Sequence, residues 1–269
     1  MKVAILFPIL LMSLSAYSQK NTHLENLVET EKNFAKSAAE KGTKSAFLQF
    51  FAEDGLVFQP QAVNAKEFWK TRPESGALLS WTPVWADIDG EGTLGYTTGP
   101  WEFRPKGKDG EPVAFGQYVT IWKMQDDGTF KAVLDIGISH DKFEGTAGKI
   151  NYPRDAAAAG EKPKDLLGPF KYPKDSIGID TRLYRDGEFP IVGNAVSERL
   201  KLEDRQYEDS GGKCNVESAG LRYCYGIVSL SFESKKPVRG NYLQIHKFRS
   251  GKWEVVLDLF SALPNGEGS

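Results

Sequence analysis

The sequence is poor in the residues that usually mark metal sites and nucleic-acid surfaces. It has two cysteines and three histidines in 269 residues, and its formal net charge is −2. No run of five like charges occurs, so we expect neither a nucleic acid nor an acidic membrane surface as partner. The histidines, His23, His140 and His246, lie far apart and lack the spacing of zinc ligands, so we expect no metal.

Cofactor-binding motifs are missing as well. Phosphate loops and serine nucleophile elbows do not occur. Residues 90–95 match the dinucleotide pattern G-x-G-x-x-G, but a strand is expected after them where that pattern needs a helix. We therefore expect no cofactor.

Long apolar runs are confined to the N-terminus. A short basic start is followed by an apolar stretch over residues 3–14 and by small residues at Ala16 and Ser18. This order is typical of a signal peptide and predicts cleavage between Ser18 and Gln19. A membrane anchor is the alternative, but the stretch is too short to span a bilayer. We expect a soluble protein, exported to the periplasm or beyond the cell, with no membrane anchor.

The two cysteines, Cys214 and Cys224, both lie in the second half of the chain. In an oxidising compartment they could form a disulfide across a hairpin. Two free thiols on neighbouring strands remain the alternative, because spacing in the sequence does not fix the distance between Cα atoms.

Helix signals dominate the first third of the chain. Thr22 and Glu25 form a capping box that predicts a helix start, and Gly42 ends the apolar periodicity that follows. A second, short apolar helix comes next. Asn64 and Glu67 form another capping box and predict a third helix.

Strand signals follow the helices. One short strand, over 56–58, is expected between the second and third helices, and four long ones follow the third helix, at about 79–88, 93–104, 113–125 and 129–139. Helices followed by a series of strands indicate an α+β fold. We expect a cone-shaped, curved antiparallel sheet wrapped on the helices, with a hollow at its wide end.

The strand region is then repeated. Residues 116–123 resemble 240–247, and residues 128–135 resemble 251–258, at nearly constant offset. Such regularity indicates a duplication. The predicted organisation is a signal peptide at 1–18, a first copy at 19–144, a linker at 145–174 and a degenerate second copy at 175–269.

The second copy has no counterpart of the long helix at 22–41. A sheet that has lost its covering helix must bury that face elsewhere. We therefore predict that this open face packs against the first copy or against another chain in a homo-oligomer.

Several segments resemble one known family. Residues 46–55, 94–104, 128–140 and 183–193 are similar to secreted proteins of the family called domain of unknown function 4440. The resemblance implies tandem copies of the nuclear-transport-factor-2-like cone fold, shared with SnoaL-like polyketide cyclases and ketosteroid isomerases. A shared fold does not carry their chemistry with it.

One carboxylate in each copy interrupts an apolar strand, Asp135 in the first and Asp258 in the second. If desolvated, such a group has a raised pKa and can act as a general base near neutral pH. The alternative is a structural aspartate held by backbone amides or an arginine. Its presence in both copies favours the structural interpretation.

Aromatic residues are numerous in the first copy. We expect some to line the hollow as an apolar pocket with a few polar groups. The candidates are Trp69, Trp81, Trp101 and Trp122, with Tyr96 and Tyr118 as hydrogen-bond donors.

Two functions are compatible with these sequence features. The first is an exported protein that binds a small apolar ligand or a protein partner through the cone pocket. The second is a cofactor-independent isomerase, cyclase or dehydratase in which Asp135 is the base and Tyr96 or Tyr118 polarises a carbonyl. A role of the duplicated copies in assembly alone is a third possibility.

Overall fold

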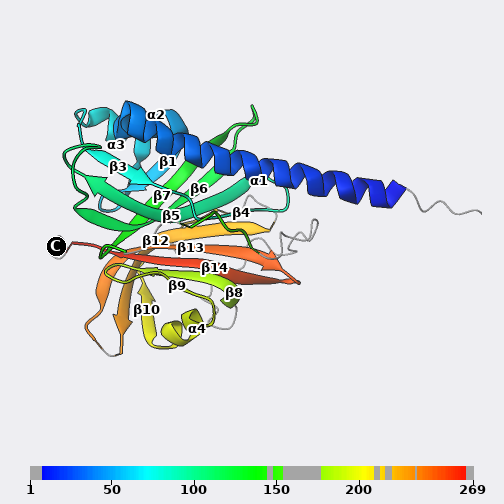
Figure 1. The fold of residues 1–269 in the computed structure, drawn as a ribbon. Helices are drawn as coiled ribbons and strands as arrows, with labels where there is room; N and C mark the ends of the chain where they lie inside the picture. Colours follow the sequence, from blue (N-terminus) through cyan, green and yellow to red (C-terminus); the bar gives the residue numbers. More distant parts are fainter. Residues whose placement is uncertain are drawn as a thin grey trace, which may run out of the picture.

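The computed structural model describes residues 8–143, 148–153, 177–208, 213–215, 220–233 and 235–264 (Figure 1). Two curved sheets pack face to face, and the helices lie on the outside. The helices are α1 (Pro8–Lys41), α2 (Thr43–Phe50), α3 (Ala65–Thr71) and α4 (Asn194–Lys201).

The first sheet has seven strands in the order β2-β1-β7-β6-β5-β3, with β4 also paired to β5. All neighbours are antiparallel except β1 and β7, which are parallel. Its strands are β1 (Phe51–Phe58), β2 (Ala62–Asn64), β3 (Leu78–Trp81), β4 (Trp85–Ile88), β5 (Leu94–Arg104), β6 (Ala114–Met124) and β7 (Phe130–His140).

The second sheet repeats this order strand for strand, β9-β8-β14-β13-β12-β10, with β11 on β12 and a parallel β8–β14 pair. No described helix corresponds to α1 or α2. The predicted duplicated α+β cone fold with a degenerate second copy is therefore confirmed. The strands are β8 (Ile177–Arg185), β9 (Ile191–Val192), β10 (Glu203–Tyr207), β11 (Lys213–Asn215), β12 (Leu221–Phe232), β13 (Val238–Arg249) and β14 (Lys252–Ala262).

Some predicted boundaries differ from the structure. The helix start at Thr22 is wrong, because α1 runs through this residue without a break. The cap at Asn64 is confirmed, since its side chain accepts a hydrogen bond of 2.9 Å from the Glu67 amide. The strand expected at 79–88 is two strands, β3 and β4. Pro83 lies between them and has no N–H for a ladder hydrogen bond.

The N-terminal and linker predictions fall partly outside the described residues. Residues 1–7, 144–147 and 154–176 are not described. The described part of the predicted linker belongs to the first sheet, because Asn151 exchanges backbone hydrogen bonds with Val84 and Ala86 beside β4. Within the described residues no helix is long and apolar enough to cross a membrane.

The faces of the two sheets that meet are those turned away from α1 and α2. Alternation along β14 sends Leu257 and Leu259 into this shared core and Asp258 to the opposite face. Of the two predicted alternatives for the open face of the second copy, packing against the first copy is therefore wrong, and packing against another chain stays a prediction. That face instead carries a buried ionic network around Asp258, and α4 covers part of it through Val196 and Leu200 against Leu183.

Polar contacts cross the core between the sheets. The Lys247 ammonium on β13 is buried against the Asp87 carboxylate on β4. The Arg182 guanidinium lies 3.5 Å from the centre of the Trp85 ring. These contacts fix how the two copies sit on each other.

The two cysteines face each other in the second sheet. Cys214 on β11 and Cys224 on β12 are cross-strand partners and form a disulfide. It ties the short edge strand β11 to the sheet.

Candidate functional site

A cavity of about 420 Å³ is lined by residues of the first sheet, its covering helices and the second copy. Its wall comes mainly from the first copy, with Trp81, Trp101, Tyr118 and Asp135 among the lining residues. Its rim includes residues of the second copy, namely Asp186, Ser261, Ala262 and Pro264.

Asp186 links the two copies at the rim of the cavity. Its carboxylate accepts hydrogen bonds of 2.8 Å from the backbone amides of Ser139 on β7 and Ala262 on β14. One carboxylate therefore links a strand end of each sheet at the mouth of the cavity.

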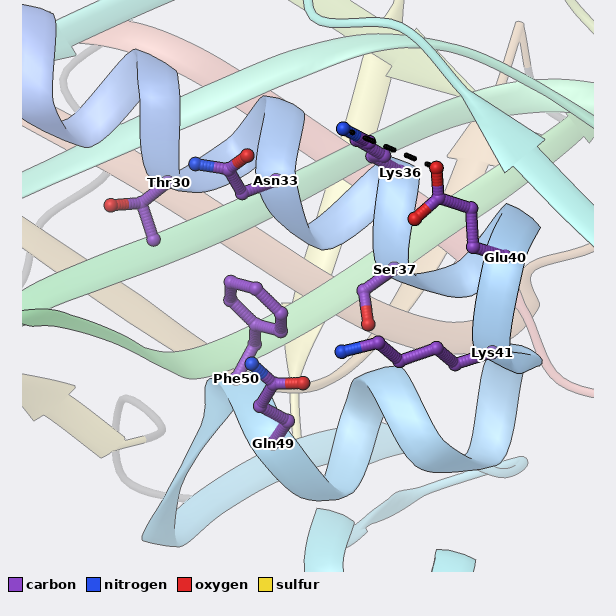
Figure 2. A pocket seen from close by; sticks show the side chains of 8 residues that line it. All are labelled: Thr30, Asn33, Lys36, Ser37, Glu40, Lys41, Gln49 and Phe50. Atoms are coloured by element: carbon purple, nitrogen blue, oxygen red, sulfur yellow. Dashed lines mark ion pairs between the residues drawn. The ribbon is translucent and has the colours of Figure 1, made fainter.

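A second hollow lies between α1 and α2 (Figure 2). Its lining is polar apart from Phe50, and Lys36 and Glu40 form an ion pair of 4.0 Å at its edge. This composition resembles an ordinary solvated surface, whereas ligand sites are mostly apolar.

Asp135, which lines the cavity, ends a row of polar side chains across the first sheet. Thr97 on β5, Thr120 on β6 and Asp135 on β7 are cross-strand partners. Tyr118 is two residues before Thr120 and so lies on the same face of the sheet. The helices α1 and α2 cover this face, and the cavity is the part that they leave open.

Asp135 carries an unusual carboxylate. The Thr120 hydroxyl donates a 2.7 Å hydrogen bond to it, and no basic side chain among the described residues is ion-paired with it. Burial raises the pKa of Asp135 to about 6, against the smaller opposite effect of Thr120. The group is thus charged at neutral pH but close to its titration range.

Glu31 on α1 is a second buried carboxyl group, and the sequence analysis missed it. It is fully buried and accepts hydrogen bonds from Trp81 Nε1 at 2.6 Å and Trp122 Nε1 at 3.0 Å. The Thr97 hydroxyl donates to it as well. Burial is the largest effect and raises the pKa of Glu31 to about 7.

The position of Glu31 in the sequence does indicate that it is buried. It lies four residues after Leu27 and three before Phe34, both buried, so it belongs to the apolar face of its helix. A charged residue on such a face needs a partner or a function.

Tyr118 has a buried hydroxyl that is near enough to feel the charges of both carboxyl groups. Burial raises the pKa of its phenol well above the usual value, and the charges of Glu31 and Asp135 raise it further. The hydroxyl lies beside Thr97, which lowers this pKa somewhat, but it makes no hydrogen bond of standard geometry within the described residues. It is therefore an unpaired buried polar group on a residue that lines the cavity.

Of the four tryptophans predicted to line the hollow, the structure places two at the cavity and two away from it. Trp81 and Trp101 line the cavity. Trp122 is fully buried, and Trp69 packs against Phe47 with ring centres 4.9 Å apart, so the expectation that these two line the hollow is wrong.

The placement of Tyr96 corrects a further expectation. Its side chain points into the core between the two sheets, where its hydroxyl accepts a 3.1 Å hydrogen bond from Trp85 Nε1. Neighbouring residues of a strand face opposite sides, so Thr97 faces the helices and Tyr96 does not. Tyr96 cannot contact a ligand in the cavity.

Asp258 has a different environment from its counterpart Asp135. Arg185 and Arg205 each contact its carboxylate at 2.8 Å, and these charges hold the pKa of Asp258 well below its usual value. Gln244, at the position of Thr120 in the repeat, also donates to it. Asp258 fits the structural interpretation, whereas no arginine that the structure describes is paired with Asp135.

Comparison with known proteins finds similarity only in solved structures; neither a family model nor a curated protein matches the chain. An NTF2-like protein with a cystatin-like fold from Novosphingobium aromaticivorans has 13% identity and a TM-score of 0.40, over 51% of this chain and 92% of its own. An NTF2-like superfamily protein from Salmonella enterica serovar Typhimurium has 15% identity and a TM-score of 0.36, over 47% and 99%. A ketosteroid isomerase-like protein from Erwinia carotovora has 12% identity and a TM-score of 0.36, over 44% and 97%. None of these assigns an activity to the chain.

Proposed function

We propose that the first copy binds a small, largely apolar molecule with one carbonyl or hydroxyl group. The cavity volume of about 420 Å³ falls within the range of small-molecule sites, about 300–1,000 Å³. Indole rings of Trp81 and Trp101 offer apolar walls, and Tyr118 and Asp135 offer the few polar groups. The observation that carries the proposal is the Asp135 carboxylate, which lines the cavity. The neutral Thr120 hydroxyl donates to it, and no basic side chain in the described part of the chain is ion-paired with it.

Calorimetric titration with 2-tetralone, a neutral bicyclic ketone, tests this proposal. Tyr118→Phe and Asp135→Asn should each weaken binding by about threefold to tenfold, the worth of one hydrogen bond. Tyr96→Phe is the matched control, because it removes the same hydroxyl from the opposite face of the sheet. Equal effects of Tyr118→Phe and Tyr96→Phe, or no binding by the unmodified protein, would contradict the proposal.

A second candidate function is proton transfer at carbon next to a carbonyl group. With a pKa of about 6, Asp135 is mostly ionised at pH 7 and can accept such a proton, while Tyr118 donates a hydrogen bond to the developing enolate oxygen. Asp135 then gives a proton back to carbon, so no other reactant is consumed. In D₂O the hydrogen on the Asp135 carboxyl group exchanges with solvent before this return, so carbon receives deuterium. In D₂O the protein should speed deuterium exchange at C1 of 2-tetralone. Asp135→Asn should slow this catalysed exchange by about a hundredfold or more, and equal rates in both proteins would exclude the catalytic role.

Export is part of the proposal. It is supported by the apolar stretch at 3–14 with its small residues at Ala16 and Ser18, and by the disulfide between Cys214 and Cys224. The mature protein recovered outside the cytoplasm should begin at Gln19 by mass spectrometry. Recovery of the whole chain in the cytoplasm with an unprocessed N-terminus would contradict export.

A further inference from the structure

The indole of Trp101 lies against the first sheet over two glycines. Trp101 on β5, Gly116 on β6 and Gly137 on β7 belong to the same face of the sheet. A Cβ atom at Gly116 would lie 2.6 Å from two atoms of the indole, and a Cβ atom at Gly137 would lie 3.3 Å from Trp101 Nε1. The ring therefore reaches from β5 across β6 to β7, and it fits there because neither glycine has a side chain.

The rest of this indole is turned to the cavity. Trp101 lines the cavity and is only half-buried, so part of its ring is accessible from there. Trp81, its cross-strand partner, is held by the protein itself. The Trp81 ring packs against Phe34 with ring centres 4.7 Å apart, and its Nε1 donates a 2.6 Å hydrogen bond to Glu31. Among the described residues no aromatic ring packs against Trp101.

The second copy fills the corresponding place with its own chain. Tyr118 pairs with Gly137 in the first sheet and Tyr242 pairs with Phe260 in the second, so Phe260 has the place of Gly137. The Phe260 ring is buried, and a Cβ atom at Gly240 on the neighbouring strand would lie 2.5 Å from it. In the first copy the missing side chain at Gly137 leaves this space to the Trp101 indole and to the cavity, which Gly137 lines.

We infer that Trp101 and Gly137 are specificity-determining residues, and that the bound molecule is an aromatic ketone or alcohol whose ring packs on the Trp101 indole. Two aromatic rings attract each other more than apolar burial alone provides, so an aromatic ring is preferred to a saturated ring of the same size. Asp135 is two residues before Gly137 on the same face of β7, so the ring and the polar group of the ligand are bound at adjacent positions. This inference rests on the proposed ligand-binding function of the cavity.

Calorimetric titration with 2-tetralone and trans-2-decalone tests the inference. Both are ketones with two fused six-membered rings and the same carbonyl position, but only 2-tetralone has an aromatic ring. The ratio of their two affinities should be about threefold to tenfold higher in the unmodified protein than in Trp101→Leu, which keeps an apolar wall without an aromatic ring. Trp253→Leu is the matched control, because it removes a half-buried indole of the second copy that does not line the cavity, and it should leave the ratio unchanged.

Gly137 is tested by filling its place. Gly137→Leu puts a side chain where Phe260 lies in the second copy, and overpacking of the cavity should weaken the binding of both ketones by about tenfold or more. Gly137→Ala adds one methyl group beside Trp101 Nε1 and should lower the ratio of the two affinities by displacing the indole. It decides the question if Gly137→Leu does not fold. Unchanged affinities in the folded Gly137 variants would overturn the role of Gly137.

The outcomes separate this inference from the pocket proposal. If both ketones bind and their affinity ratio is the same in the unmodified protein and in Trp101→Leu, the role of Trp101 is overturned and the pocket proposal stands. If neither ketone binds to the unmodified protein, the pocket proposal is overturned and this inference with it.

Discussion

Replacing Lys247 by methionine should lower the free energy of unfolding by about 3–5 kcal/mol. Lys247 is fully buried between the two sheets, where its ammonium contacts the Asp87 carboxylate and lies 3.4 Å from the Ile88 carbonyl oxygen. Methionine fills similar space but removes the charge. The Asp87 carboxylate then stays buried without its cation, which is the costly state of a broken buried ion pair.

Urea unfolding at pH 7 measures the loss, and two variants make it specific. The double variant Asp87→Asn, Lys247→Met should recover much of the stability, because no uncompensated charge remains. Lys123→Met is the matched control, since Lys123 has the same place in the first copy but is only half-buried. A loss below about 1 kcal/mol for Lys247→Met, or equal losses for the two lysines, would contradict this account of how the copies are joined.

Stability should fall as pH rises from about 4.5 to about 7 because of Glu31. The pKa of this group is 4.5 as an ordinary side chain and about 7 in the fold, so the folded protein binds its proton more tightly than the unfolded chain. Deprotonation therefore costs more in the folded state, and the loss is complete above the folded pKa. The shift corresponds to about 3 kcal/mol for this fully buried group.

Urea unfolding at pH 5 and pH 8 measures this loss, and Glu31→Gln provides the comparison. The variant cannot ionise, so its stability should change much less over this range. Asp135 contributes in the same direction between its ordinary 3.8 and about 6, but it is only half-buried and contributes less. An equal decline in both proteins would show that Glu31 is not the buried acid responsible.

The fold was predictable because its signals are local. The dipeptides Asp109-Gly110 and Asp127-Gly128 are typical of hairpin turns between strands. The match of 116–123 to 240–247 revealed the duplication. The parallel pairing of β1 with β7 has no such signal, because it joins segments that are about seventy residues apart in the sequence.

The faces of the strands were harder to assign. Both faces of the first sheet are buried, one against the helices and one against the second sheet, so apolar residues occupy both. Alternation alone then cannot say which face Tyr96 or Tyr118 belongs to.

The side chains that surround Asp135 and Asp258 could not be predicted from the residues next to them in the sequence. Asp135 and Asp258 follow the same Val-Leu pair, yet only Asp258 has Arg185 from β8 and Arg205 from β10 beside it. These arginines are more than fifty residues away along the chain. The duplication alone therefore favoured a structural role for both aspartates. The packing gives that role to Asp258 and leaves Asp135 at the cavity.

The most direct test of this account is a carboxyl ¹³C NMR titration of Asp135 and Asp258 from pH 3 to pH 8. Asp135 should titrate with a midpoint near 6, and Asp258 should stay ionised to the lower end of the range. Asp135→Asn and Asp258→Asn assign the two signals. A midpoint of Asp135 at the ordinary value near 3.8, or the same behaviour in both residues, would contradict the claim that the first copy holds a desolvated carboxylate ready for a ligand.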